Sequence, residues 1–133
     1  MKKVLVLSSS LHNKSNSETL AQEFAKSAVE AGNKVEFESL LGKKIGQLKT
    51  MLARANSLYT SDYKFREIYL LTAAADTDKT AMNIAKRGIS GWIACFDGVK
   101  LKGALCATGA ENPGDVKERA TLLKKVYAMG NKV

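Results

Sequence analysis

The chain has 133 residues, of which 45% are hydrophobic and 26% are charged. This length corresponds to a single domain over residues 1–133, and the apolar content excludes a mainly disordered chain. Two cysteines are too few for a disulfide scaffold, and no apolar run approaches the roughly 20 residues of a membrane helix. We therefore expect a cytoplasmic protein with no membrane partner, in which Cys95 and Cys106 are reduced, buried thiols.

The net charge is +8, because 21 lysine and arginine residues stand against 13 aspartate and glutamate residues. Such an excess attracts anions such as nucleic acid or phosphorylated cofactors. The basic residues come as scattered pairs such as Lys43-Lys44 and Lys124-Lys125, and no basic stretch is interleaved with aromatic residues. Solvated helix faces and strand edges explain this pattern, and nucleic acid is not expected as a partner.

The first half of the chain predicts two strands around a helix. Lys3–Ser8 is continuously apolar, which is typical of a parallel strand buried on both faces. A helix opens at Ser15, where Glu18 completes a capping box, and it ends at Gly32-Asn33. Residues 34–40 (KVEFESL) alternate in polarity, which predicts a half-exposed strand at a sheet edge.

The second half continues the alternation of helices and strands. We expect Ile84 and Trp92 on the buried face of its longer helix, and we expect Asp115 to cap the last helix with Glu118 at capping-box spacing. Strands that alternate with helices imply a parallel sheet covered on both faces, an α/β/α sandwich. The expected elements are a helix over about 46–59, a strand within 65–74, a helix over about 77–96, a strand over 99–108 and a final helix from Asp115.

The loop after the first strand is the segment that best suits a ligand. In doubly wound sheets, ligands bind beyond the carboxyl ends of the strands. Residues 8–17 (SSSLHNKSNS) lie there, rich in serine, and run into a helix N-terminus. Hydroxyl groups, free backbone amides and the positive end of the helix dipole suit a phosphate. A plain polar loop with a good helix cap is the alternative, since the loop matches neither GxGxxG nor the Walker pattern.

Residues 4–21 (VLVLSSSLHNKSNSETLA) resemble the start of the NAD(P)H-dependent FMN reductases, which have a flavodoxin-like fold. Ser9 and residues 15–21 match that family's loop and helix start, whereas Ser8 and Leu11 stand where glycine and arginine are usual. The resemblance continues in residues 46–49 (GQLK), in residues 68–76 (IYLLTAAAD) and in the terminal strand and helix. It implies FMN as cofactor and NAD(P)H as electron donor. The residues it implies for cofactor binding are Ser9, Ser15, Asn16 and Ser17 at the phosphate and Thr72, Ala73 and Ala74 near the flavin ring.

The chain departs from this family between Ile45 and Gly46, where members carry a further helix and strand whose loop packs on the isoalloxazine ring. The resemblance then implies a shortened flavodoxin-like domain with a four-stranded parallel sheet of order 2-1-3-4. We expect redox activity to be weak or lost, and the sequence contains no evident catalytic or metal-ligand set. Three alternatives stay open: an engineered deletion variant or fold-test scaffold without catalytic function, an anion or nucleic-acid binding module, and a homodimer in which a partner chain fills the gap.

Overall fold

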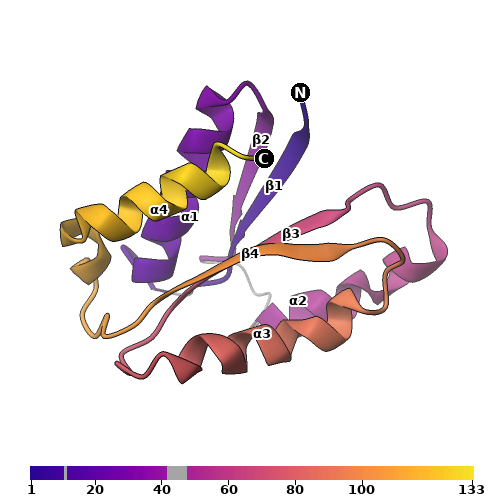
Figure 1. The fold of residues 1–133 in the computed structure, drawn as a ribbon. Helices are drawn as coiled ribbons and strands as arrows, with labels where there is room; N and C mark the ends of the chain where they lie inside the picture. Colours follow the sequence, from indigo (N-terminus) through magenta and orange to yellow (C-terminus); the bar gives the residue numbers. More distant parts are fainter. Residues whose placement is uncertain (11, 42–47) are drawn as a thin grey trace.

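The computed structural model describes residues 1–10, 12–41 and 48–133 and has the predicted α/β class (Figure 1). Strands and helices alternate along the chain as expected. The departure predicted between Ile45 and Gly46, the pair Lys43-Lys44 and the position of Leu11 lie outside the described residues. The elements are β1 (Lys3–Ser8), α1 (Asn16–Glu30), β2 (Lys34–Ser39), α2 (Leu48–Arg54), the 3-10 helix η1 (Ala55–Thr60), β3 (Glu67–Ala73), α3 (Thr80–Ile93), β4 (Lys100–Ala107), the 3-10 helix η2 (Asp115–Glu118) and α4 (Ala120–Gly130).

The described strands form two separate two-stranded sheets in place of the single sheet of order 2-1-3-4. β1 pairs in parallel with β2, and β3 pairs in parallel with β4. The second ladder has one irregularity, between Ile68 and Tyr69. No ladder joins β1 to β3 in the part of the chain that the structure describes.

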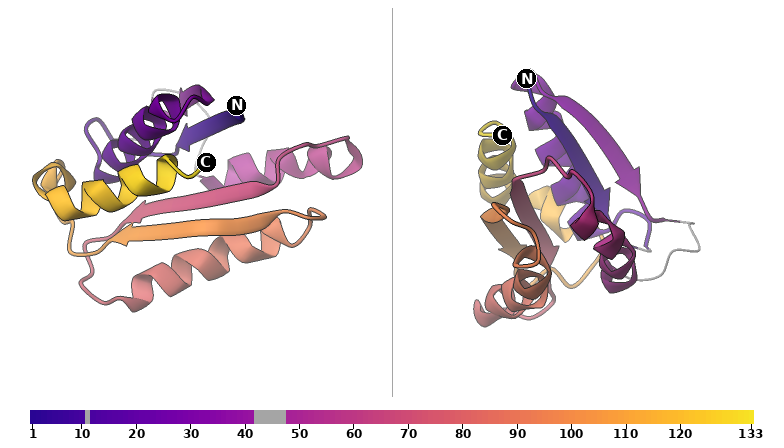
Figure 2. Two further views of the ribbon diagram at one scale, coloured as in Figure 1. Left: turned by 45° about the horizontal axis from the view of Figure 1, so that its top comes forward. Right: turned by 90° about the vertical axis from the view of Figure 1, so that its right-hand side faces the viewer.

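One layer of helices covers both sheets. α1 contacts β1, β2 and β3, and α4 packs alongside α1 (Figure 2). The ring of Phe24 on α1 lies 5.2 Å from the ring of Tyr69 on β3, between ring centroids. The two sheets therefore share one hydrophobic core beneath α1 and α4. Its buried members are Val6, Leu20, Ala21, Phe24, Ala107, Ala110, Val116 and Val126.

A second, largely aromatic core lies on the opposite face of the β3–β4 sheet, where α3 packs. Trp92 is half-buried in this core, as predicted, and its Nε1 donates a hydrogen bond to the carbonyl oxygen of Leu52 on α2 at 3.2 Å. The segment α2–η1 thus packs against α3. Ring contacts join Tyr59, Tyr63, Phe65, Trp92 and Phe96.

Because α2 packs on α3, one face of β1 stays open. Val4 and Val6 face the core beneath α1, but Leu5 is 58% exposed and Leu7 is 40% exposed. The expectation that both faces of this strand are buried is therefore wrong for the face that carries Leu5 and Leu7. The three-layer arrangement is accordingly not seen at β1–β2.

Three further expectations need correction. Asp115 does not cap the last helix, which starts at Ala120. Its carboxylate accepts a hydrogen bond from the Asn112 amide at 2.8 Å, and residues 115–118 form a 3-10 turn before the helix. Ile84 on α3 is 70% exposed, since the helix packs through its other side. Cys95 is exposed because it lies just past the end of α3. In the described residues, no helix is long and apolar enough to cross a membrane.

Candidate anion-binding site

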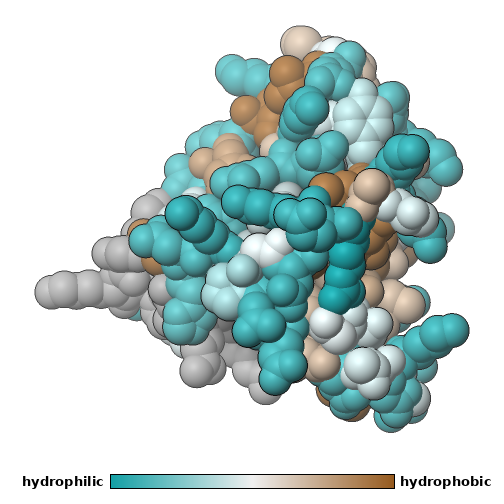
Figure 3. Space-filling view, turned by 90° about the vertical axis from the view of Figure 1, so that its left-hand side faces the viewer, coloured by the Kyte–Doolittle hydropathy of each residue, from teal (hydrophilic) through white to brown (hydrophobic). Residues whose placement is uncertain are grey.

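The loops that follow β1, β3 and β4 meet at one edge of the molecule, where all the strands end (Figure 2). The loop after β4 connects the other two. Its Gly109 and Ala110 amides donate to the carbonyl oxygens of Asp76 and Ala74, at 2.8 and 2.9 Å. Its Asn112 carbonyl accepts a hydrogen bond from Asn16, at the start of α1. Hydrogen bonds thus join the three loops, and Figure 3 shows that the surface on this side is largely hydrophilic.

The N-terminus of α1 is built as the sequence predicts. Ser15 has extended backbone angles (φ −66°, ψ 152°), and its Oγ accepts a hydrogen bond from the Glu18 amide at 3.1 Å. The Ser17 hydroxyl lies 3.5 Å from the Ser15 hydroxyl. Among the described residues, the amides of Asn16 and Ser17 have no acceptor. Two backbone donors and two hydroxyls therefore converge at the positive end of a 15-residue helix.

Asn16 has a different role from the one predicted. Its side chain is only 8% exposed, because it turns away from the loop and inserts between α1 and η2. Its Nδ2 donates to the carbonyl oxygen of Asn112 at 2.8 Å, and its Oδ1 accepts from the amide of Val116 at 3.0 Å. The side chain joins two distant segments, and only its backbone amide remains for an anion.

The β1–α1 loop adds further hydroxyl groups. Ser9 is half-buried, and the Ser10 Oγ accepts a hydrogen bond from the His12 amide at 3.2 Å. Lys14 has a left-handed backbone (φ 56°), which is uncommon for a residue with a side chain. Ser8, at the end of β1, is only 3% exposed, and its Oγ has no hydrogen-bond partner among the described residues. A buried hydroxyl without a partner is costly, so this turn holds an unused polar group.

The residues expected near a flavin ring are partly buried and lie at the end of β3. Ala73 packs against the core beneath α1 and α4. The backbone of Ala74 is fully used, because its amide donates to the Ala107 carbonyl and its carbonyl accepts from the Ala110 amide. The Thr72 hydroxyl is buried and has no hydrogen-bond partner in the part of the chain that the structure describes. Ser15 and Ser17 thus lie together at the start of α1, and Ser9 lies earlier in the loop that leads to them. Thr72, Ala73 and Ala74 are only partly exposed at the end of β3.

Arg119 is a residue of this edge that sequence reasoning missed. Its two guanidinium nitrogens donate to the carbonyl oxygens of Thr108 and Gly109, at 2.6 and 2.5 Å. Gly109 has a left-handed backbone (φ 63°). The sequence around Gly109 and Arg119 contains no pattern that predicts this contact. Beside it, a hollow of about 530 Å³ is lined by Cys106, Thr108, Glu118, Thr121 and Lys125, among others.

Comparisons with protein-family models, curated proteins and solved structures found no match for this chain.

Proposed function

We propose that this chain binds the phosphate group of FMN at the N-terminus of α1 and has little or no reductase activity. The observation that carries the proposal is the first turn of α1. There the Asn16 and Ser17 amides have no acceptor among the described residues, beside the hydroxyls of Ser15 and Ser17. Free amides and the helix dipole favour a dianion at such a turn. The Ser9 hydroxyl would add a donor from the same loop.

The fold interpretation belongs to the same proposal. We infer a shortened flavodoxin-like domain in which the strands keep the order 2-1-3-4 without a bond between β1 and β3. Parallel pairing within each sheet and the shared layer of α1 and α4 support this order. The resemblance of residues 4–21 to the NAD(P)H-dependent FMN reductases supports the choice of FMN over other phosphates.

The residues at this edge fit a phosphate but not the ring of a flavin. Ala73 packs against the core and the Ala74 backbone is fully bonded, and both residues are only partly exposed, which limits the surface that they offer an isoalloxazine. We therefore derive no hydride transfer from this site. FMN when bound to a protein supplies the redox chemistry, whereas this chain supplies only contacts to its phosphate.

An FMN titration followed by flavin fluorescence tests the proposal, with riboflavin as the ligand that lacks the phosphate. We expect saturable binding of FMN and no saturable binding of riboflavin. Ser17→Asp places a negative charge in the first turn and should weaken FMN binding by at least roughly tenfold. Gln22→Asp adds the same charge on an exposed position of α1 beyond the first turn and serves as the matched control.

Two results would overturn the proposal. Equal binding of FMN and riboflavin would mean that the phosphate is not recognised. Binding of neither flavin would favour the alternative of a folded scaffold without a cofactor.

A further inference from the structure

β1 and β3 each have one backbone edge that no described strand pairs. The amides of Lys34 and Leu40 donate to the carbonyl oxygens of Lys2 and Ser8, both at 2.9 Å. Even-numbered residues of β1 therefore bond to β2, and the amide and carbonyl of Leu5 point to the other edge. The described chain has no strand on that side of β1.

The same alternation applies to β3. The Arg66 carbonyl accepts from the Lys100 amide and the Ala74 amide donates to the Ala107 carbonyl, both at 2.9 Å. Even-numbered residues of β3 thus bond to β4, and the amide and carbonyl of Leu71 point away from it. Unpaired strand edges are templates for another strand.

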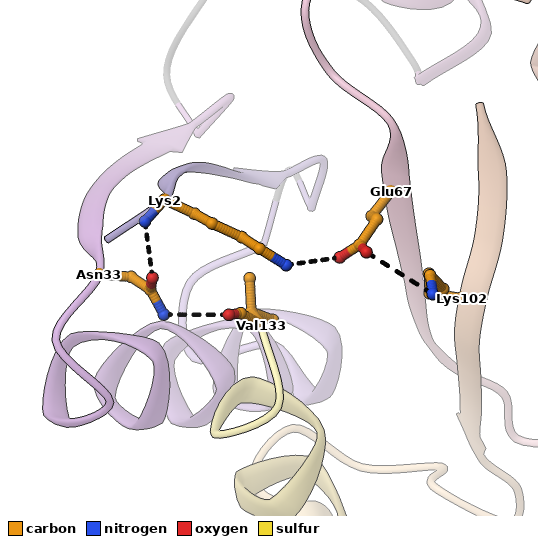
Figure 4. Close-up of polar contacts among 5 residues, drawn as sticks. All are labelled: Lys2, Asn33, Glu67, Lys102 and Val133. Carbon is orange, nitrogen blue, oxygen red and sulfur yellow. Dashed lines mark hydrogen bonds and ion pairs between the residues drawn. The ribbon is translucent and has the colours of Figure 1, made fainter. Parts of the chain in front are cut away.

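These two unpaired edges lie over the same helical layer. Val6 of β1 and Leu71 of β3 belong to one hydrophobic core, and α1 contacts both strands. The Lys2 Nζ reaches the Glu67 Oε2 at 3.1 Å, so an ion pair links the starts of the two strands. Figure 4 shows the Lys2 side chain stretched from the start of β1 towards Glu67 on β3. Two long side chains end to end span up to about 10 Å, on the order of two strand spacings, so this ion pair is compatible with one strand between β1 and β3.

We propose that the gap between β1 and β3 accepts an extended segment of a different polypeptide, which forms backbone hydrogen bonds with both edges. β1 has 6 residues, which sets the length of the paired segment. Alternate side chains of the segment would meet the core beneath α1 on one face and Leu5 and Leu7 on the other. A strand that is apolar on both faces satisfies these surroundings.

The charges at the amino ends of the strands indicate which residues the inserted segment should carry at one end. β1, β2 and β4 begin with lysine and Arg66 directly precedes β3, and parallel strands bring these ends to one edge of the molecule. Glu67, at the same edge, already contacts Lys2 and Lys102, at 3.1 and 3.6 Å. A segment with Asp or Glu at the end that reaches this edge complements it. The exposed basic residues are Lys2, Lys3, Lys34, Arg66, Lys100 and Lys102.

The same charges disfavour a second copy of this chain as the occupant. Any of its strands inserted in parallel would place lysine or arginine against Lys2 and Lys3, and adjacent like charges are destabilising. The proposal does not depend on the phosphate site, which lies at the opposite ends of the strands.

A synthetic peptide tests the proposal with the intact chain. The probe is a fluorescein-labelled peptide with two acidic residues followed by about six alternating valines and isoleucines. We expect saturable one-to-one binding and slowed hydrogen exchange at the Leu5 and Leu71 amides. Replacing the acidic pair by lysines should weaken binding by at least roughly tenfold.

Backbone methylation of the peptide tests whether both edges are used. Two further peptides carry N-methyl groups on alternate amides, one set for each side of the strand. Each should lose roughly a hundredfold in affinity, because each set removes about three hydrogen bonds to one edge. Undiminished binding of either methylated peptide would overturn pairing with both edges.

A pair of variants at Leu5 separates the amide from the side chain. Leu5→Pro removes the amide that faces the gap and leaves the bonds to β2, whereas Leu5→Ala keeps that amide. Peptide binding should be lost in the first variant and retained in the second, with circular dichroism confirming that both fold. Equal binding to both variants would contradict the proposal. Concentration-dependent dimers with the same exchange protection, formed without peptide, would show that a second copy fills the gap and would also overturn it.

Discussion

Replacing Asn16 by alanine should destabilise the fold far more than an ordinary change in a surface loop. The Asn16 side chain accepts a hydrogen bond from the amide of Val116. Because Val116 is 0% exposed, that amide cannot form a hydrogen bond to water instead. A buried amide left without an acceptor costs about 1–3 kcal/mol. The exposed Asn112 carbonyl regains water, which limits that second loss to about 1 kcal/mol. We expect a total destabilisation of about 2–3 kcal/mol, a large part of the stability of a small domain.

Urea unfolding followed by circular dichroism measures this change in the free energy of unfolding. Asn13→Ala is the matched control, because Asn13 is exposed in the same loop and should change stability by less than about 0.5 kcal/mol. Asn16→Asp keeps an acceptor for the Val116 amide but sets a carboxylate against the Asn112 carbonyl, so it should fall between the two. If Asn16→Ala unfolds like the control, the buried link between α1 and η2 does not exist as described.

Two other predictions concern a helix contact and an ion pair. A Cβ on Gly130 would lie 2.5 Å from the carbonyl oxygen of Phe24, so Gly130→Ala should force α1 and α4 apart and lower the Tm. Gly88→Ala is the control, because a Cβ at Gly88 has no described atom within 4 Å and alanine favours a helix over glycine by about 1 kcal/mol. A Tm for Gly130→Ala as high as that of Gly88→Ala would refute the close contact. The hydrogen bond from Lys2 holds the pKa of Glu67 below its ordinary value of 4.5. The ion pair stabilises the fold above that value, and this stabilisation is lost as pH falls through the lowered pKa. Between about pH 3 and 6, the stability of Glu67→Gln should therefore depend less on pH than that of the original chain. Identical profiles would contradict the ion pair.

Local chemistry predicted the parts of the site that depend on neighbouring residues in the sequence. The Ser15 side chain caps α1 because its Oγ reaches an amide three residues later, and such a contact needs no tertiary fold. The turn after α1 was predicted for the same reason, since Gly32 adopts a left-handed backbone (φ 85°) that only glycine enters at no cost. The meeting of the three loops follows from parallel pairing, which alternation of strands and helices already implied.

Contacts between distant residues were beyond the sequence pattern. Asn16 stands where a phosphate ligand would be expected, but its partners are 96 and 100 residues further along the chain. Hydrophobic periodicity shows that a helix face is buried and does not say against which element. The sequence predicts a helix over about residues 46–59, but its pattern does not show that Leu52 packs in the aromatic core beside α3.

The apolar sequence of β1 does not match its surroundings, because one of its faces meets solvent. Lys3–Ser8 has the continuous apolar run of a strand covered on both faces, yet Leu5 and Leu7 meet solvent. Natural sequences rarely keep such a conflict between local pattern and environment, and exposed apolar side chains beside an unpaired edge favour association. The Lys2–Glu67 ion pair joins only the starts of β1 and β3, and no described strand pairs with the edge of β1 that carries the Leu5 amide. The unpaired backbone edge of β1 therefore calls for a strand beside it, whereas the exposed Leu5 and Leu7 side chains call for a layer over its open face.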